Sequence, residues 1–120
     1  MARGNNFEDK RLTIKLQVNF GDRRLDNMGF TDDISASGIF IKTAVVFPSN
    51  TIIGIELVLP GGEIARMKGV VNWSKGVPPN LVWATKDAGM GVKITEYIQG
   101  KDSYYRTLVD GLSSDPNKSH

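Results

Sequence analysis

Residues 32–38 (DDISASG) gather acidic, hydroxyl and glycine residues within seven positions. Asp and Ser side chains hydrogen-bond nearby backbone groups, and Gly adopts backbone angles that other residues avoid, so this composition is typical of a tight turn between strands. The same short polar side chains and exposed backbone N–H groups can form a concave acceptor for a polar, anionic ligand. The residues alone leave both a structural turn and a ligand-binding turn open.

A small basic cluster, Lys10 and Arg11, precedes the first apolar run of the chain. An Arg guanidinium can bind guanine O6/N7 or a phosphate with two parallel hydrogen bonds, and it stacks on flat rings. The structural alternative is that both side chains only keep the end of a strand soluble.

The elements that must position these groups are strands. Apolar and polar residues alternate over residues 11–20, 53–59 and 65–73, and this period of two predicts strands with one buried face. In the last of these segments, Met67, Val71 and Trp73 are expected to point inward. A hairpin about Gly61 would place Glu56 opposite Arg66 on the outer face, an exposed pair that adds about 0.2–1 kcal/mol.

Shorter strands are expected at residues 30–34, 39–43 and 89–94, which brings the total to six. Residues 76–89 form a long connection that contains Leu81-Val82-Trp83. This apolar group either folds over the open end of a barrel or forms an exposed patch for a partner. Residues 102–112 change to helical spacing, with Asp102 or Ser103 as the N-cap.

The predicted organisation is one all-β domain with a covering helix. We expect a flexible leader at residues 1–10, a barrel or sandwich at 11–98, a C-terminal α-helix at 101–112 and a disordered tail at 113–120. The 120 residues are enough for one core.

Composition argues against several classes of protein. The chain has no Cys and its one His is His120, so a histidine-based triad or metal cluster in the core is not expected, nor is a bound cofactor. No phosphate-binding glycine motif of the nucleotide-hydrolase or dinucleotide type occurs, and the prediction is that the protein is not an enzyme.

The N-terminus leads into no apolar segment and no run is long enough to span a bilayer, which predicts a cytoplasmic protein without membrane insertion. The net charge of +2 does not indicate a general nucleic-acid binder.

A family resemblance connects the turn with the basic cluster. Residues 33–38 (DISASG) match the D/N-x-S-x-x-G signature of PilZ domains. The flanking segments 10–16, 39–43, 69–73 and 89–92 resemble strands of that family in order and spacing, so the likeness runs from about Lys10 to Glu96. It implies a six-stranded antiparallel PilZ-type β-barrel that binds the bacterial second messenger cyclic di-GMP.

The resemblance also implies the ligand-binding residues. In PilZ domains the nucleotide is held by an R-x-x-x-R segment before the first strand and by the Asp, Ser and Gly of the turn. The corresponding positions here are Arg11, Asp33, Ser35 and Gly38, with Lys10 as a neighbouring cation. The first arginine of the segment is replaced by Phe7, so the motif is incomplete.

Two functional hypotheses follow from the resemblance. The first is a cyclic di-GMP receptor in bacterial signalling that controls motility, pili or biofilm through a protein partner. The second is a PilZ-like adaptor that does not bind the nucleotide and acts by protein contact, which the replacement at Phe7 and the Leu81-Val82-Trp83 segment favour. A third class, a barrel that binds single-stranded nucleic acid, needs exposed aromatic side chains along a basic groove, whereas Phe20 and Phe30 are expected to point inward.

Overall fold

The computed structural model describes residues 10–113 of the chain. Within this range the strands are β1 (Leu12–Thr13), β2 (Gln17–Gly21), β3 (Asn27–Ile34), β4 (Gly38–Lys42), β5 (Ile52–Val58), β6 (Ile64–Lys75) and β7 (Gly89–Gln99). A short 3-10 helix, η2 (Pro79–Leu81), lies between β6 and β7, and helix α1 (Lys101–Ser113) follows β7. None of the helices in residues 10–113 has the length and apolar character needed to cross a bilayer.

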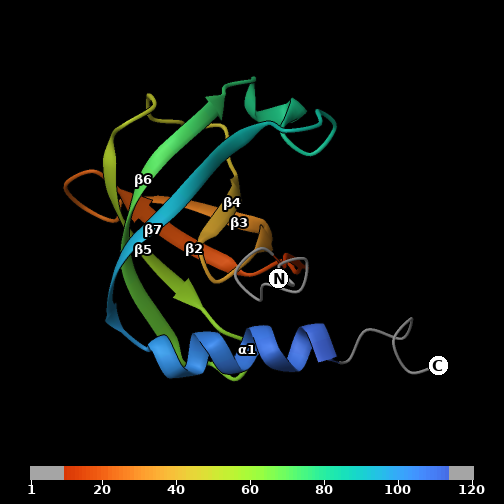
Figure 1. Cartoon of the computed structure of the whole chain (residues 1–120). Helices are drawn as coiled ribbons and strands as arrows, with labels where there is room; N and C mark the ends of the chain where they lie inside the picture. Colours follow the sequence, from red (N-terminus) through yellow and green to blue (C-terminus); the bar gives the residue numbers. More distant parts are fainter. Residues whose placement is uncertain (1–9, 114–120) are drawn as a thin grey trace, which may run out of the picture.

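The strands form a closed antiparallel barrel (Figure 1). Their order is β1-β3-β2-β5-β6-β7-β4, and the pairing of β3 with β4 closes the sheet on itself. The six longer strands make the barrel, while β1 adds a two-residue pairing beside β3. The predicted six-stranded barrel with a C-terminal helix is confirmed.

The first predicted strand, residues 11–20, is interrupted in the structure. It is divided into β1 and β2, which both pair with β3. The side chain of Thr31 on β3 occupies the break, because its Oγ1 accepts a hydrogen bond from the Leu16 N–H (2.9 Å) and donates one to the Ile14 carbonyl (2.6 Å). A side-chain bridge thus replaces part of the backbone ladder, which a strict two-residue period does not reveal.

The barrel interior is filled by inward-facing aliphatic and aromatic side chains, with Val18, Phe20, Ile55, Leu57 and Met67 buried. This arrangement follows from the alternation, since successive side chains of a strand point to opposite faces. The hairpin of β5 and β6 has the predicted register, with Glu56 opposite Arg66.

Helix α1 lies across one end of the barrel, and the connection that contains η2 lies at the other end (Figure 1). Tyr104 and Leu108 of α1 are buried against the barrel core. The helix begins at Lys101, so Asp102 and Ser103 lie in its first turn and neither is the N-cap that was predicted. It follows Gly100, whose φ of 79° suits glycine and whose carbonyl accepts a hydrogen bond from the Tyr104 N–H.

The predicted leader and tail fall mostly outside the described residues, which exclude residues 1–9 and 114–120. Of these two segments, Lys10 is described and exposed, and Ser113 is the last residue of α1.

Candidate functional site

The turn between β3 and β4 is closed by its own polar groups. The Ser35 N–H donates to the Gly38 carbonyl at 2.8 Å. The Ser35 hydroxyl oxygen accepts hydrogen bonds from the backbone N–H groups of Ser37 (3.2 Å) and Gly38 (3.1 Å). Ser35 is fully buried, so its side chain fixes the shape of the turn from within.

Two tyrosines anchor the carbonyl side of this turn. The Tyr104 hydroxyl of α1 donates to the Ser35 carbonyl at 2.6 Å, and the Tyr97 hydroxyl of β7 donates to the Ala36 carbonyl at 2.9 Å. Burial, with a smaller contribution from Tyr97, raises the pKa of Tyr104 far above its ordinary value. Tyr104 therefore remains a protonated donor at neutral pH, and the turn is held to both β7 and α1.

Gly38 is required by the close approach of β4 to β7. A Cβ atom at this position would lie 2.9 Å from the Val92 carbonyl oxygen, closer than real Cβ contacts allow. The glycine of the signature therefore has a packing reason that is independent of any ligand.

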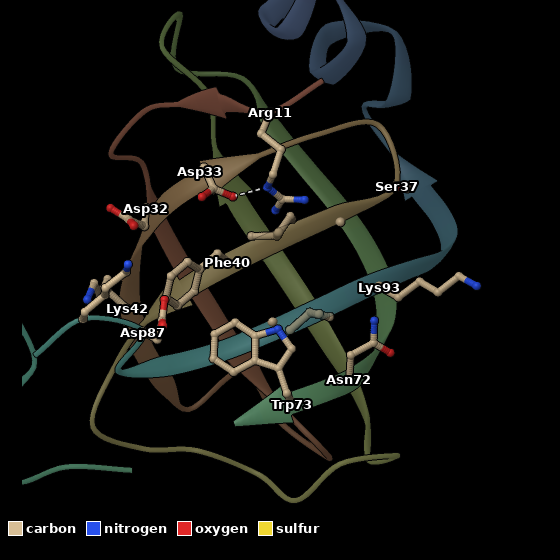
Figure 2. A pocket seen from close by; sticks show the side chains of 15 residues that line it. Arg11, Asp32, Asp33, Ser37, Phe40, Lys42, Asn72, Trp73, Asp87 and Lys93 are labelled. Atoms are coloured by element: carbon tan, nitrogen blue, oxygen red, sulfur yellow. Dashed lines mark hydrogen bonds and ion pairs between the residues drawn. The ribbon is translucent and has the colours of Figure 1, made fainter. Parts of the chain in front are cut away.

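Arg11 lies over this turn and pairs with Asp33 (Figure 2). Its Nε donates to Asp33 Oδ1 at 2.5 Å, and its Nη1 lies 3.5 Å from the Ser35 hydroxyl oxygen. The Arg11 side chain is 45% exposed and that of Asp33 is 23% exposed. One arginine thus connects the segment before β1 with both the carboxylate and the hydroxyl of the turn.

Below this pair, a cavity of about 550 Å³ opens on the outer surface of the barrel (Figure 2). It lies across β3, β4, β6 and β7, and residues 86 and 87 of the β6–β7 connection complete its wall. The register of β3 against β4 shifts between Thr31 and Asp33. Because such a shift breaks the strict alternation of faces, the neighbouring residues Asp32 and Asp33 both line the cavity.

Trp73 also lines the cavity, which corrects the prediction that it points inward. Its side chain is 40% exposed because the register of β6 against β7 shifts between Val71 and Trp73. The indole lies against the Gly91 backbone of β7, where a Cβ atom would be 2.1 Å from its Nε1. It also makes an edge contact with Phe40, with ring centroids 5.1 Å apart.

Charged side chains of both signs surround these aromatic rings. The cations that line the cavity are Arg11, Lys42, Lys86 and Lys93, and the anions are Asp32, Asp33 and Asp87. An aromatic wall, a guanidinium, a carboxylate and several ammonium groups in one cavity are what a purine nucleotide needs for base stacking, recognition of the base edge and phosphate binding. Within residues 10–113, no cluster of His, Cys, Asp or Glu side chains is arranged to hold a metal ion.

The sequence-predicted site residues come together in part. Arg11, Asp33 and Gly38 line the cavity. Ser35 does not line it but lies directly behind Arg11. Lys10 is exposed and is not part of the lining. Phe7, at the first position of the arginine segment, lies outside the described residues, so only the second position, Arg11, is located.

Trp73 and Phe40 are site residues that the sequence prediction missed. The available signal was glycine spacing, since Gly89 and Gly91 both fall in the last predicted strand. Glycine inside a strand often indicates a bulge or the close approach of another group. At Gly91 that group is the Trp73 ring, whereas at Gly89 it is the Ile41 backbone of β4.

The connection between β6 and β7 has one buried and two exposed apolar side chains in its Leu81-Val82-Trp83 segment. Val82 is buried, with 5% of its surface exposed, whereas Leu81 and Trp83 are 42% and 54% exposed. The buried Lys42 side chain holds the connection in place, because its Nζ donates to the Thr85 carbonyl at 2.9 Å and to the Val82 carbonyl at 3.4 Å. Val82 is not part of the hydrophobic cluster that fills the barrel, and the exposed patch for a partner stays a prediction.

Comparisons with known proteins support the fold. No family model and no curated protein sequence matches the chain. The solved structure of the Bacillus subtilis inhibitor of motility (MotI/DgrA) is similar, with a TM-score of 0.72 at 17% sequence identity. The alignment covers 88% of this chain and 51% of the other, so the chain spans about half the length of that neighbour. The barrel therefore has the PilZ-like fold.

Proposed function

We propose that this chain is a receptor module that binds cyclic di-GMP in the cavity beside the β3–β4 turn. The observation that carries the proposal is the Arg11–Asp33 pair, which the turn holds at the edge of a cavity with an aromatic wall. Cavities that bind small molecules commonly have volumes of roughly 300–1,000 Å³, and this one is about 550 Å³.

Each part of the cavity has a chemical role in this proposal. The Arg11 guanidinium binds guanine O6/N7 or a phosphate oxygen, and the Asp33 carboxylate accepts hydrogen bonds from the donor groups of the guanine edge. Trp73 offers a surface for base stacking. Ser35 and Gly38 act through the shape of the turn, since their side chain and N–H groups already bond to one another. Lys10, exposed and next to Arg11 in the sequence, adds a further positive charge for an anionic ligand.

The proposed role is in bacterial signalling rather than catalysis. The fold is shared with a protein described as an inhibitor of motility. Control of motility, pili or biofilm through a protein partner in the cytoplasm fits a module that binds a second messenger.

An amide NMR titration with cyclic di-GMP tests the proposal. We expect saturable shifts at Arg11, at residues 32–38 and at Trp73, and none at the outer pair Glu56 and Arg66. A spectrum that stays unchanged at millimolar cyclic di-GMP, or that shifts only outside the cavity, would overturn the proposal.

A second candidate function is a PilZ-like adaptor that acts by protein contact without the nucleotide. The exposed side chains of Leu81 and Trp83 favour it. An adaptor of this kind would give no nucleotide-dependent shifts in the same titration, and it would lose its partner when Trp83 is changed to Ala.

A further inference from the structure

The exposed part of the β6–β7 connection forms a defined surface next to the first strands of the barrel. Trp83 meets Lys15, whose Nζ lies 4.6 Å from the centre of an indole ring and 5.0 Å from the centre of the Phe30 ring. Phe30 is only half-buried, not fully inward as the alternation predicted. Leu81, Trp83, Lys15 and Phe30 are called the Trp83 surface below.

The Trp83 surface is held rigid by its backbone. The Leu81 N–H donates to the Pro78 carbonyl at 2.9 Å and the Ala84 N–H donates to the Leu81 carbonyl at 3.2 Å, which makes two successive turns. The ammonium of Lys42 also donates hydrogen bonds to the Val82 and Thr85 carbonyls of the connection. An exposed aromatic side chain on a fixed backbone loses little conformational freedom on binding, and Trp is enriched among residues that dominate binding energy at protein interfaces.

The charge around this surface is positive. Lys15 lies on it, and the Lys42 Nζ lies 5.8 Å from the centre of a Trp83 ring. Lys75 and Lys86 flank the same connection in the chain, with Lys75 Nζ 3.3 Å from the Lys86 carbonyl. Residues 75–88 contain one acidic residue, Asp87, against Lys75 and Lys86. Asp87 and Lys86 both line the cavity beside the β3–β4 turn. A partner that matches this surface therefore carries negative charge next to apolar groups.

We propose that the Trp83 surface binds an acidic segment of a partner protein that carries aliphatic or aromatic side chains. Its apolar side chains pack on Trp83 and Leu81, and its carboxylates meet Lys15 and the neighbouring lysines. A protein segment fits better than single-stranded nucleic acid, because nucleic acid needs a row of stacking aromatics along a basic groove. The inference rests on the proposed function, since a receptor without catalysis passes its signal through a partner.

Lys42 connects this surface with the cavity. Its side chain lines the cavity wall and bonds to the connection that carries Trp83. An anionic ligand in the cavity attracts the same ammonium group. Nucleotide binding therefore acts on a group that fixes the backbone of the Trp83 surface.

Selection from a displayed library of random peptides tests the inference. The full chain is the target, and each enriched peptide is then tested for binding to the wild type and to Trp83→Ala. We expect enrichment of peptides with several Asp or Glu residues around aliphatic or aromatic ones. The inference is overturned if no peptide is enriched, if enriched peptides lack acidic residues, or if they bind the Trp83→Ala variant equally well.

A selected synthetic peptide then gives a direct readout. Trp73→Phe leaves Trp83 as the sole tryptophan of the chain, so its fluorescence reports on this surface. We expect peptide binding to change the emission and to weaken at least about tenfold in Lys15→Glu, with little change in the control Lys68→Glu, which reverses an exposed lysine on β6. Equal loss in both variants, a response to oligo-dT alone, or self-association that Trp83→Ala abolishes would each contradict the proposed occupant.

Cyclic di-GMP binding is measured on the wild type and on Trp83→Ala, which both keep Trp73 in the cavity wall. Peptide binding without nucleotide binding would reject the receptor proposal and keep the surface. Nucleotide binding without peptide binding would reject the proposed peptide surface and keep the receptor proposal.

Discussion

Two arginine–carboxylate pairs of this barrel differ in their surroundings rather than in their chemistry. Arg11 and Asp33 are 45% and 23% exposed, and Arg66 and Glu56 are 52% and 22% exposed. The first pair lies at a cavity beside a turn whose backbone is tied to two tyrosines. The second joins neighbouring strands on the open face of the β5–β6 hairpin.

The comparison shows that similar exposure of an ion pair is compatible with two roles, a cross-strand contact or part of a ligand site, depending on the neighbouring groups. The outer pair fits the role of an ordinary cross-strand contact, with Asn19 Nδ2 3.4 Å from Glu56 Oε1. The cavity pair faces Trp73 and several lysines across an open space. Each pair therefore serves as the control for the other.

The largest expected effect is the loss of nucleotide binding in Arg11→Ala. One bidentate guanine contact contributes about 1–3 kcal/mol, so the affinity for cyclic di-GMP should fall roughly five- to 150-fold. Arg66→Ala, the matched control, should bind like the wild type in the same calorimetric titration. Unchanged affinity in Arg11→Ala would remove the distinction between the two pairs.

Asp33→Ala is expected to have the next largest effect. It removes the acceptor for the guanine edge but also releases Arg11 from its partner, so part of the loss is recovered and we expect about a tenfold weaker affinity. The matched control is Glu56→Ala. If both alanine variants bind equally, the carboxylate does not recognise the base.

Trp73→Ala tests the wall of the cavity opposite the pair. Base–aromatic stacking contributes about 1–3 kcal/mol, and because Trp73 lies at one side of the cavity we expect a loss near the lower limit, about fivefold. The other tryptophan provides the control, since Trp83 does not line the cavity. A larger effect from Trp83→Ala on nucleotide affinity would place the binding site elsewhere.

Tyr104→Phe should lower the stability of the barrel and change binding little. It removes the hydrogen bond to the Ser35 carbonyl, which has a net contribution of about 0.5–1.5 kcal/mol to the free energy of unfolding. Chemical denaturation monitored by circular dichroism measures this change. An unchanged free energy of unfolding would mean that α1 does not secure the turn.

The smallest expected effect is that of Arg66→Ala on stability. An exposed cross-strand ion pair contributes about 0.2–1 kcal/mol, and high salt should screen most of it. The same denaturation experiment at low and high ionic strength measures the difference. A loss that exceeds about 2 kcal/mol would show that the pair on the outer face is more than a cross-strand contact.

The sequence was sufficient to predict the barrel and the outer pair, because both depend on regular alternation. Residues 53–59 and 65–73 alternate about a short loop, and this set the register of Glu56 against Arg66. The turn at residues 35–38 was also recognisable, since its Ser and Gly have local roles.

The sequence did not predict the aromatic wall of the cavity. The position of Trp73 depends on a register shift between β6 and β7, which arises from pairing with a distant strand rather than from local residues. The break between β1 and β2 has the same kind of origin, since Thr31 of β3 fills it. Alternation assigns a face to each residue only where the ladder is regular.

Calorimetric titration of cyclic di-GMP into the wild type, Arg11→Ala and Arg66→Ala tests the central claim most directly. We predict saturable heat for the wild type and for Arg66→Ala, and at least about fivefold weaker binding for Arg11→Ala. No heat from the wild type at high-micromolar ligand, or the same affinity in all three proteins, would contradict the account.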